Sequence, residues 1–424
     1  MKYKKKILKN GLRIITVPMK DNNTVTALVL VEAGSKYEEK NNNGISHFLE
    51  HVCFKGTKNR PNPGDISREL DGLGAETNAF TSHEFTGYYA KAHSKHTHKL
   101  IEIISDLYLN PVFNENEINK EKGVIIEEMN MYEDLPMRKV HDVLMNLLYG
   151  DQPAGMTIGG DPNFVKIALP KDFIEYRHKH YVASATTVVV AGNINESAVI
   201  KDIEKRFENI SESKKYKKLK VKESQKDSQI AIKHKKLDQT HLVLAVRAFD
   251  TFKKESAVVS VIAGLLGSGM SSRLFTKLRE EMGVCYYVRS GNNTFTDHGY
   301  LDVSVGSDNK RAKEVITAIL EEFKKLKTEI VSEKELKKTK EYLIGGMTLS
   351  LESSDSFAEF YGIQDILKET IESPKEKADR IKKVTAGDIK KTANKIFTNA
   401  NLNLAIVGGV DEKQKQELLK LLKL

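Results

Sequence analysis

The chain has 424 residues, of which 40% are hydrophobic and 29% are charged, with a formal net charge of +9. This length predicts two or three domains, and the mixture of both charges is typical of a soluble globular protein. No apolar run is long enough to span a bilayer, and two cysteines, Cys53 and Cys285, are too few for a disulfide framework.

The basic N-terminus, MKYKKKILKNGLRIITVP, leads into a strand-like alternation and lacks the apolar core of an export signal. We therefore expect a cytoplasmic protein, in a reducing compartment, without a membrane partner.

The stretch GISHFLEHVCFKGT places His47, Glu50 and His51 within five residues. Apolar residues fall at helix-compatible positions, and Ser46 is predicted to cap the helix start. Residues four apart share one helix face, so the two imidazoles would face one ion with Glu50 beside them. A catalytic zinc site also needs a third ligand and an open position for water. The pattern alone is also compatible with an ordinary amphipathic helix.

The stretch GAETNAFTSHEFTGYYAKA, residues 74–92, is by itself typical of a simple edge strand. The histidines of HSKHTH, residues 93–98, open a helical segment, and we do not expect them to bind metal.

The stretch INKEKGVIIEEMNMYEDLP, residues 118–136, predicts an acidic helix. Glu121 and Glu128 are close to two turns apart and share a face, whereas Glu127 points away by about one hundred degrees. An acidic face is usually only solvated. This face is nevertheless the best candidate to supply the third ligand.

Lysines are spread along the whole chain, which argues against a nucleic acid partner, because nucleic acid binding favours a concentrated basic face. The densest run, KKYKKLKVK at residues 214–222, is interpreted as part of a solvated connector.

Strand-like segments recur in the two halves of the chain. ALVLVEAGS from Ala27 resembles HLVLAVRAFD from His241, and TTVVVAGNI from Thr186 resembles LNLAIVGGV from Leu402. Both pairs are displaced by almost the same distance, which predicts a duplicated domain.

Each half begins with alternating strands, continues through helical patterns and closes with a helix, an apolar strand and a Gly-rich turn. This order predicts an α+β fold of two duplicated α/β sandwich domains, each a largely antiparallel sheet packed with helices. We place the N-terminal domain at residues 1–212 and the homologous C-terminal domain at residues 228–424. The polar, lysine-rich stretch 213–227 is predicted to be a linker.

These residues resemble the pitrilysin and mitochondrial processing peptidase family of zinc metallopeptidases, the inverzincins with the motif H-x-x-E-H. The resemblance covers essentially the whole chain, including the duplication, and is to the short bacterial and archaeal members. Seventy-six residues separate His51 from Glu128, which is the spacing of that family's zinc-binding glutamate, and Glu121 matches its second acidic residue. Ser46 stands where an alanine is usual. Cys53 stands where a methionine is common and is interpreted as a core residue.

The resemblance implies a zinc-dependent metalloendopeptidase that acts on peptides or unfolded segments in a closed chamber. His47, His51 and Glu128 would bind Zn²⁺. Glu50 would be the general base toward the attacking water, and Glu121 would orient the site from outside the ligand set.

The resemblance also implies that the backbone around Asn78, Ala79 and Phe80 pairs with an extended peptide substrate. In the second half, Arg279 would hold a substrate carbonyl and Tyr286 would stabilise the oxyanion. In the short members this pair would come from a partner subunit, so we expect a homodimer. Action within one chain and a heterodimer with a second product both stay open.

Two rival functions stay open: a non-catalytic assembly subunit of the same fold, and a basic nucleic-acid-binding protein. The first usually lacks the ligands, all of which are present here. The second would need tight nucleic acid binding at physiological salt. The sequence leaves the physiological substrate open.

Overall fold

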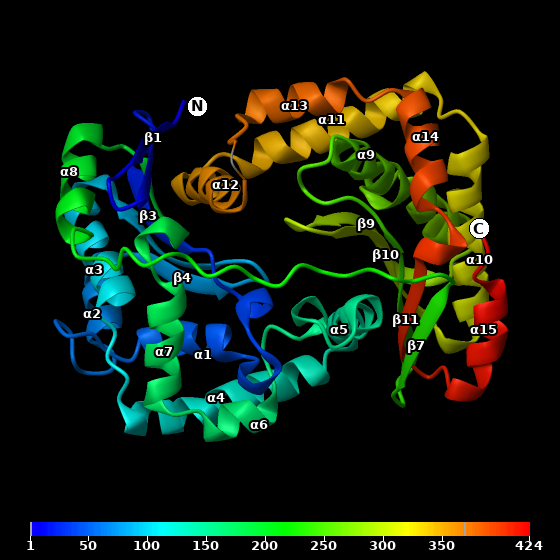
Figure 1. The fold of residues 1–424 in the computed structure, drawn as a ribbon. Helices are drawn as coiled ribbons and strands as arrows, with labels where there is room; N and C mark the ends of the chain where they lie inside the picture. The colour runs from blue at the N-terminus through cyan, green and yellow to red at the C-terminus, as the bar shows by residue number, and fades with distance from the viewer. Residues whose placement is uncertain (1, 369) are drawn as a thin grey trace. The chain divides into compact units, whose positions relative to one another are not determined.

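The computed structural model describes residues 2–368 and 370–424, which form two compact units (Figure 1). Unit 1 comprises Met1–Met129, Met156–Leu219 and Leu349–Pro374. Unit 2 comprises Asn130–Gly155, Lys220–Thr348 and Lys375–Leu424. Each unit therefore combines segments from both halves of the sequence.

Unit 1 is built on a sheet with the strand order β1-β2-β6-β3-β5-β4 among the described residues. The strands are β1 Lys4–Ile7, β2 Arg13–Pro18, β3 Thr24–Val31, β4 Glu76–Thr81, β5 Thr86–His93 and β6 Thr186–Gly192. Only β2 and β6 run parallel within this sheet, and the other neighbours run antiparallel. β3 and β6 are buried along nearly their whole length, because helices cover both faces of the sheet.

Helices from the first half of the sequence cover one face of this sheet, and their apolar residues form one core with the strands. They are α1 Ile45–Cys53, α2 Asp65–Gly72, α3 Thr97–Leu109, α6 Pro162–Ile167, α7 Pro170–His180 and α8 Glu196–Arg206. The rings of Phe48 and Phe173, for example, meet edge to face with centroids 4.9 Å apart. Helix α12 Ser354–Leu367, from the second half of the sequence, packs its Phe357 and Tyr361 on the opposite face.

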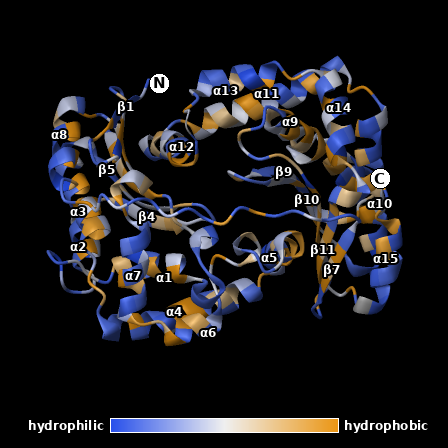
Figure 2. Cartoon of the chain, in the orientation of Figure 1, coloured by the Kyte–Doolittle hydropathy of each residue, from blue (hydrophilic) through white to orange (hydrophobic). Residues whose placement is uncertain are grey.

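Unit 2 is built on a sheet with the strand order β7-β11-β8-β10-β9, again among the described residues. The strands are β7 Gln229–His234, β8 Gln239–Arg247, β9 Cys285–Thr294, β10 Gly299–Asp308 and β11 Leu402–Gly408. Helices α9 Glu255–Gly267, α10 Ala312–Thr328 and α14 Ala386–Ile396 share a core with one face of this sheet. Helix α5 Pro136–Tyr149, from the first half of the sequence, packs on the other face. Figure 2 shows hydrophobic colour on α9 and on the strands β7 and β11.

The two sheets share one topology. Without β1, the first order reads β2-β6-β3-β5-β4, and each strand matches the strand at the same place in β7-β11-β8-β10-β9. In both sheets the first pair is parallel and the remaining neighbours are antiparallel. The predicted α+β fold with two duplicated halves is therefore confirmed.

Helix α4 Glu115–Glu133 adds Ile118 and Ile125 to the core of unit 1. Buried residues are added to the core of unit 2 by α11 Glu333–Ser350, α13 Pro374–Lys382 and α15 Lys415–Leu421. The predicted linker, residues 213–227, contains no helix or strand. Two of its lysines are nevertheless engaged, since Lys215 pairs with Glu32 at 2.6 Å and Lys218 with Glu84 at 3.4 Å in unit 1. The domain ranges 1–212 and 228–424 stay a prediction.

Helix α12 is fixed to its sheet by a buried carboxylate. Asp365 accepts hydrogen bonds from Arg13 Nε at 2.9 Å and from Thr187 Oγ1 at 2.8 Å. We expect Asp365→Ala to lower the free energy of unfolding of unit 1 by about 3 kcal/mol, because it leaves the largely buried Arg13 without its counter-charge. Urea denaturation followed by circular dichroism measures this loss.

The control is Glu321→Ala, which removes an exposed carboxylate from α10. We expect it to change the free energy of unfolding by less than about 0.5 kcal/mol. Equal stability of the two variants would show that Asp365 does not hold α12.

Candidate metal centre and active site

The start of α1 is organised by the buried carboxylate of Glu38. Glu38 accepts hydrogen bonds from the backbone N–H groups of Gly44 at 2.7 Å and Ser46 at 2.9 Å, and from Asn43 Nδ2 at 2.8 Å. Gly44, with φ 103°, is the residue that precedes the helix. The prediction that Ser46 caps this helix was wrong, because Ser46 lies inside the first turn and its hydroxyl bonds Tyr176 at 2.7 Å.

Three candidate ligands meet at one point between α1 and α4. His47 Nε2 and His51 Nε2 lie 3.3 Å apart, and Glu128 Oε2 lies 3.7 Å from the first and 3.5 Å from the second. The ligand atoms of all three residues lie within 4.8 Å of one another. Across the described residues this is the one group of three or more His, Cys, Asp or Glu with such spacing.

Glu121 lies directly behind His51. His51 Nδ1 donates to Glu121 Oε1 at 2.9 Å, which fixes the tautomer and leaves Nε2 as the ligand atom. Lys55 Nζ pairs with the other oxygen of Glu121 at 2.6 Å. Burial would raise the pKa of Glu121, but the bonds from His51 and Lys55 hold that pKa below its usual range. Burial by itself would lower the pKa of His51, but the hydrogen bond to Glu121 and the nearby carboxylates raise that pKa above its usual value.

The surroundings of His47 and Glu50 shift their pKa values in opposite directions. Burial and the neighbouring His51 lower the pKa of His47 to about 4, so its imidazole is neutral at pH 7. Burial raises the pKa of Glu50, although a hydrogen bond from Thr81 opposes the shift. Thr81 Oγ1 lies 2.5 Å from Glu50 Oε2.

This donor set fits a zinc ion. Two imidazole nitrogens and one carboxylate oxygen are a known ligand combination for catalytic Zn²⁺. Within the described part of the chain, the carboxylates of Glu50, Glu121 and Glu128 are paired with one ammonium group, that of Lys55, so a dication would neutralise the excess negative charge. The buried Nδ1 of His47 has no hydrogen-bond partner among the described residues.

The predicted substrate residues lie on an exposed sheet edge. β4 pairs only with β5 among the described residues, so its outer side is open for a further strand. Asn78 is exposed, and Ala79 and Phe80 are half-buried. The backbone N–H of Ala79 donates to the side chain of Asn78 at 2.9 Å.

Arg279 and Tyr286 lie together in unit 2. Arg279, on a π-helical turn Phe275–Glu281, donates through Nη1 to the backbone carbonyls of Cys285 at 2.8 Å and Tyr286 at 2.9 Å. The side chain of Tyr286 is 62% exposed at the start of β9. Both residues line a hollow of about 490 Å³ together with Lys310.

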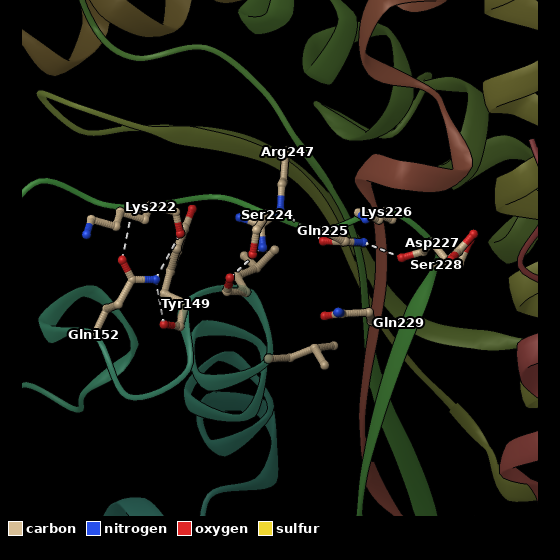
Figure 3. Close-up of a pocket in the computed structure, with 12 residues that line it drawn as sticks. Tyr149, Gln152, Lys222, Ser224, Gln225, Lys226, Asp227, Ser228, Gln229 and Arg247 are labelled. Carbon is tan, nitrogen blue, oxygen red and sulfur yellow. Dashed lines mark hydrogen bonds between the residues drawn. The ribbon is translucent and has the colours of Figure 1, made fainter.

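A larger hollow of about 570 Å³ in unit 2 lies between α5 and the linker (Figure 3). Its polar groups bind one another: Gln152 accepts from the N–H of Lys222 at 2.7 Å, and Arg247 donates to Gln225 at 2.9 Å. No predicted site residue lines this hollow, whose bonds anchor the linker instead.

Sequence reasoning missed three residues of the site: Glu38 at the helix start, Lys55 behind Glu121, and Thr81 on Glu50. Lys55 lies in the turn just past the end of α1, four residues after His51, so a position near His51 was readable from the sequence. Cys53 is a buried core residue with its thiol near Tyr88 and takes no part in the ligand group.

Comparison with known proteins identifies the family. Residues 13–161 match the family model of insulinase, peptidase family M16, and residues 169–343 match the model of the peptidase M16 inactive domain. A Bacillus subtilis protein described as the uncharacterized zinc protease YmxG is 33% identical over 392 residues, which cover 92% of this chain and 94% of that protein. The chain belongs to peptidase family M16.

Two further similar proteins support this family membership and the fold. The beta subunit of the mitochondrial-processing peptidase of Bos taurus is 30% identical over 417 residues, which cover 96% of this chain and 84% of that subunit. A solved protease from Helicobacter pylori has a TM-score of 0.90 at 24% identity, with 96% of this chain and 99% of that chain covered, and supports the fold. The predicted family is confirmed, and relatives named zinc proteases support the metallopeptidase class and zinc. Among the described helices, none has the length and apolar content needed to cross a membrane.

The site geometry gives a prediction for Glu121. We expect Glu121→Gln to weaken zinc binding by roughly 10- to 100-fold. The neutral amide oxygen of Gln can still accept the hydrogen bond from His51, but it lacks the negative charge that makes the imidazole a better ligand. Titration against a chromophoric chelator measures the zinc dissociation constant. Glu127→Gln is the control, since Glu127 is exposed on the same helix. Equal zinc affinities of the two variants would contradict the role of Glu121.

Proposed function

We propose that this protein is a zinc-dependent metalloendopeptidase that hydrolyses peptides or unfolded segments inside a closed chamber. The observation that carries this proposal is the meeting of His47, His51 and Glu128 within 4.8 Å of one another, beside the carboxylate of Glu50. The membership in family M16 supports the same reaction class.

His47, His51 and Glu128 would hold the zinc ion. When bound there, zinc supplies Lewis acidity and a water whose pKa is lowered toward neutrality. Glu50 would take the proton of the attacking water and then deliver it to the leaving amine.

The substrate would be held as an added strand. The outer edge of β4 at Asn78, Ala79 and Phe80 would bind an extended peptide by main-chain hydrogen bonds, which tolerate many sequences. The exposed hydroxyl of Tyr286 would stabilise the oxyanion. Arg279 would hold a substrate carbonyl through the donors that its bonds to Cys285 and Tyr286 leave free.

Two variants distinguish the proposed role of Glu50 as the base from the proposed role of His51 as a zinc ligand. We expect Glu50→Gln to bind zinc but to lose peptidase activity by roughly 100-fold or more, since it removes the proton acceptor. We expect His51→Ala to lose both zinc and activity. Zinc analysis and cleavage of a peptide library, with and without a chelator, measure both. Full activity of Glu50→Gln would refute the assignment of the base.

We further propose a cytoplasmic homodimer in which the Arg279 and Tyr286 of one subunit complete the zinc site of the other. Mixing Glu50→Gln subunits with Tyr286→Phe subunits should then restore part of the activity, because one site of each hybrid dimer contains neither substitution. No recovery after demonstrated subunit exchange would assign the reaction to a single chain.

A non-catalytic assembly subunit is the alternative function. The model matched by residues 169–343 is described as an inactive domain, and that range lacks the proposed ligands. The complete ligand group in the first half favours the peptidase.

A further inference from the structure

A hydrogen bond joins the candidate base to the edge strand. Thr81, the last residue of β4, donates from Oγ1 to Glu50 Oε2 at 2.5 Å. A hydroxyl that donates to an ionised carboxylate makes one of the stronger hydrogen bonds in proteins. This bond occupies Oε2 of Glu50 and leaves Oε1 to receive a proton.

The hydroxyl of Thr81 is held by a rigid strand end. Strand alternation places Ala79 against the helix-covered core and Phe80 against the α12 side, so Thr81 points like Ala79, toward α1. Phe80 lies over Gly87 of the paired strand, where an added Cβ would come within 2.4 Å of its ring. The β-branched side chain of Thr81 has few χ1 alternatives. The strand and the few χ1 rotamers therefore restrict the direction of its hydroxyl.

We propose that Thr81 is a positioning residue that holds Glu50 in its catalytic orientation and ties that orientation to the peptide-binding strand. This inference rests on the proposed peptidase function. Thr81 touches neither the candidate ligand atoms nor the substrate edge at Asn78 and Ala79 directly, so its loss should affect the proton transfer and not the binding of zinc or peptide.

The test compares Thr81→Val, which keeps the shape of the side chain, with Thr81→Ser, which keeps the hydroxyl. We expect Thr81→Val to lower kcat roughly tenfold or more with KM unchanged, the scale of a lost hydrogen bond to a charged group. We expect Thr81→Ser to retain most of the wild-type kcat. The zinc dissociation constant should be the same in all three proteins.

The control is Thr16→Val, because Thr16 Oγ1 makes the same kind of bond to Glu196 Oε2, at 3.0 Å, in a part of unit 1 without site residues. We expect it to leave kcat unchanged. In a Glu50→Gln background, Thr81→Val should cause no further loss of kcat and no change in peptide affinity, since its effect acts through the base.

Several results would overturn the inference. These are an unchanged kcat in Thr81→Val, an equal loss in Thr81→Ser, a further loss in the Glu50→Gln background, or weaker binding of zinc or peptide. If Thr81→Val does not fold, the same comparison is made between Thr81→Ala and Thr81→Ser. A wild-type protein without peptidase activity would instead refute the proposed function, and this inference with it.

Discussion

The candidate site in unit 1 depends on one geometric constraint: the possible ligand atoms of His47, His51 and Glu128, from two separate helices, lie within 4.8 Å of one another. Contacts at both ends of α1 hold the helix in this position. At its start, Glu38 binds the first N–H groups, and the backbone of Gly160 lies so close that an added Cβ would come within 2.3 Å of Gly44 Cα. At its end, Lys55 pairs with Glu121 of α4. The ligand face of α1 therefore has little freedom to rotate away from Glu128.

The two halves of the chain share a fold but differ in the side chains that could take part in a reaction. Helix α9 follows β8 and precedes β9, just as α1 follows β3 and precedes β4. Its sequence, ESAVVSVIAGLLG, contains Glu255 as its one ionisable side chain and has no histidine. The same position in the fold thus carries the helix with two candidate metal ligands in one half and an apolar core helix in the other. The match of the second half to a family model accordingly indicates its fold. Its function has to be judged from the side chains that it places at a site.

Local periodicity made part of this site readable from the sequence. Helical spacing placed His47 and His51 on one face, and the resemblance to the family, through its spacing to a zinc-binding glutamate, pointed to Glu128, which the structure brings next to them. Residues that meet only through the tertiary fold were not readable, because no pattern within β4 indicates that Thr81 bonds Glu50. The packing partners of α5 and α12 were likewise not readable from a local pattern. Each of them packs on the sheet formed by the other half of the sequence.

The open edge of β4 bears on which substrates this site accepts. An unpaired edge is an aggregation hazard unless it is protected, and here the N–H of Ala79 is already bound to the side chain of Asn78. An incoming peptide must replace this local bond with a main-chain bond of its own. Only an extended segment can present the regular donors and acceptors that make the exchange favourable along several residues. A folded protein surface rarely offers such a segment, so under the proposed function the edge would select unfolded chains by their conformation rather than by their sequence.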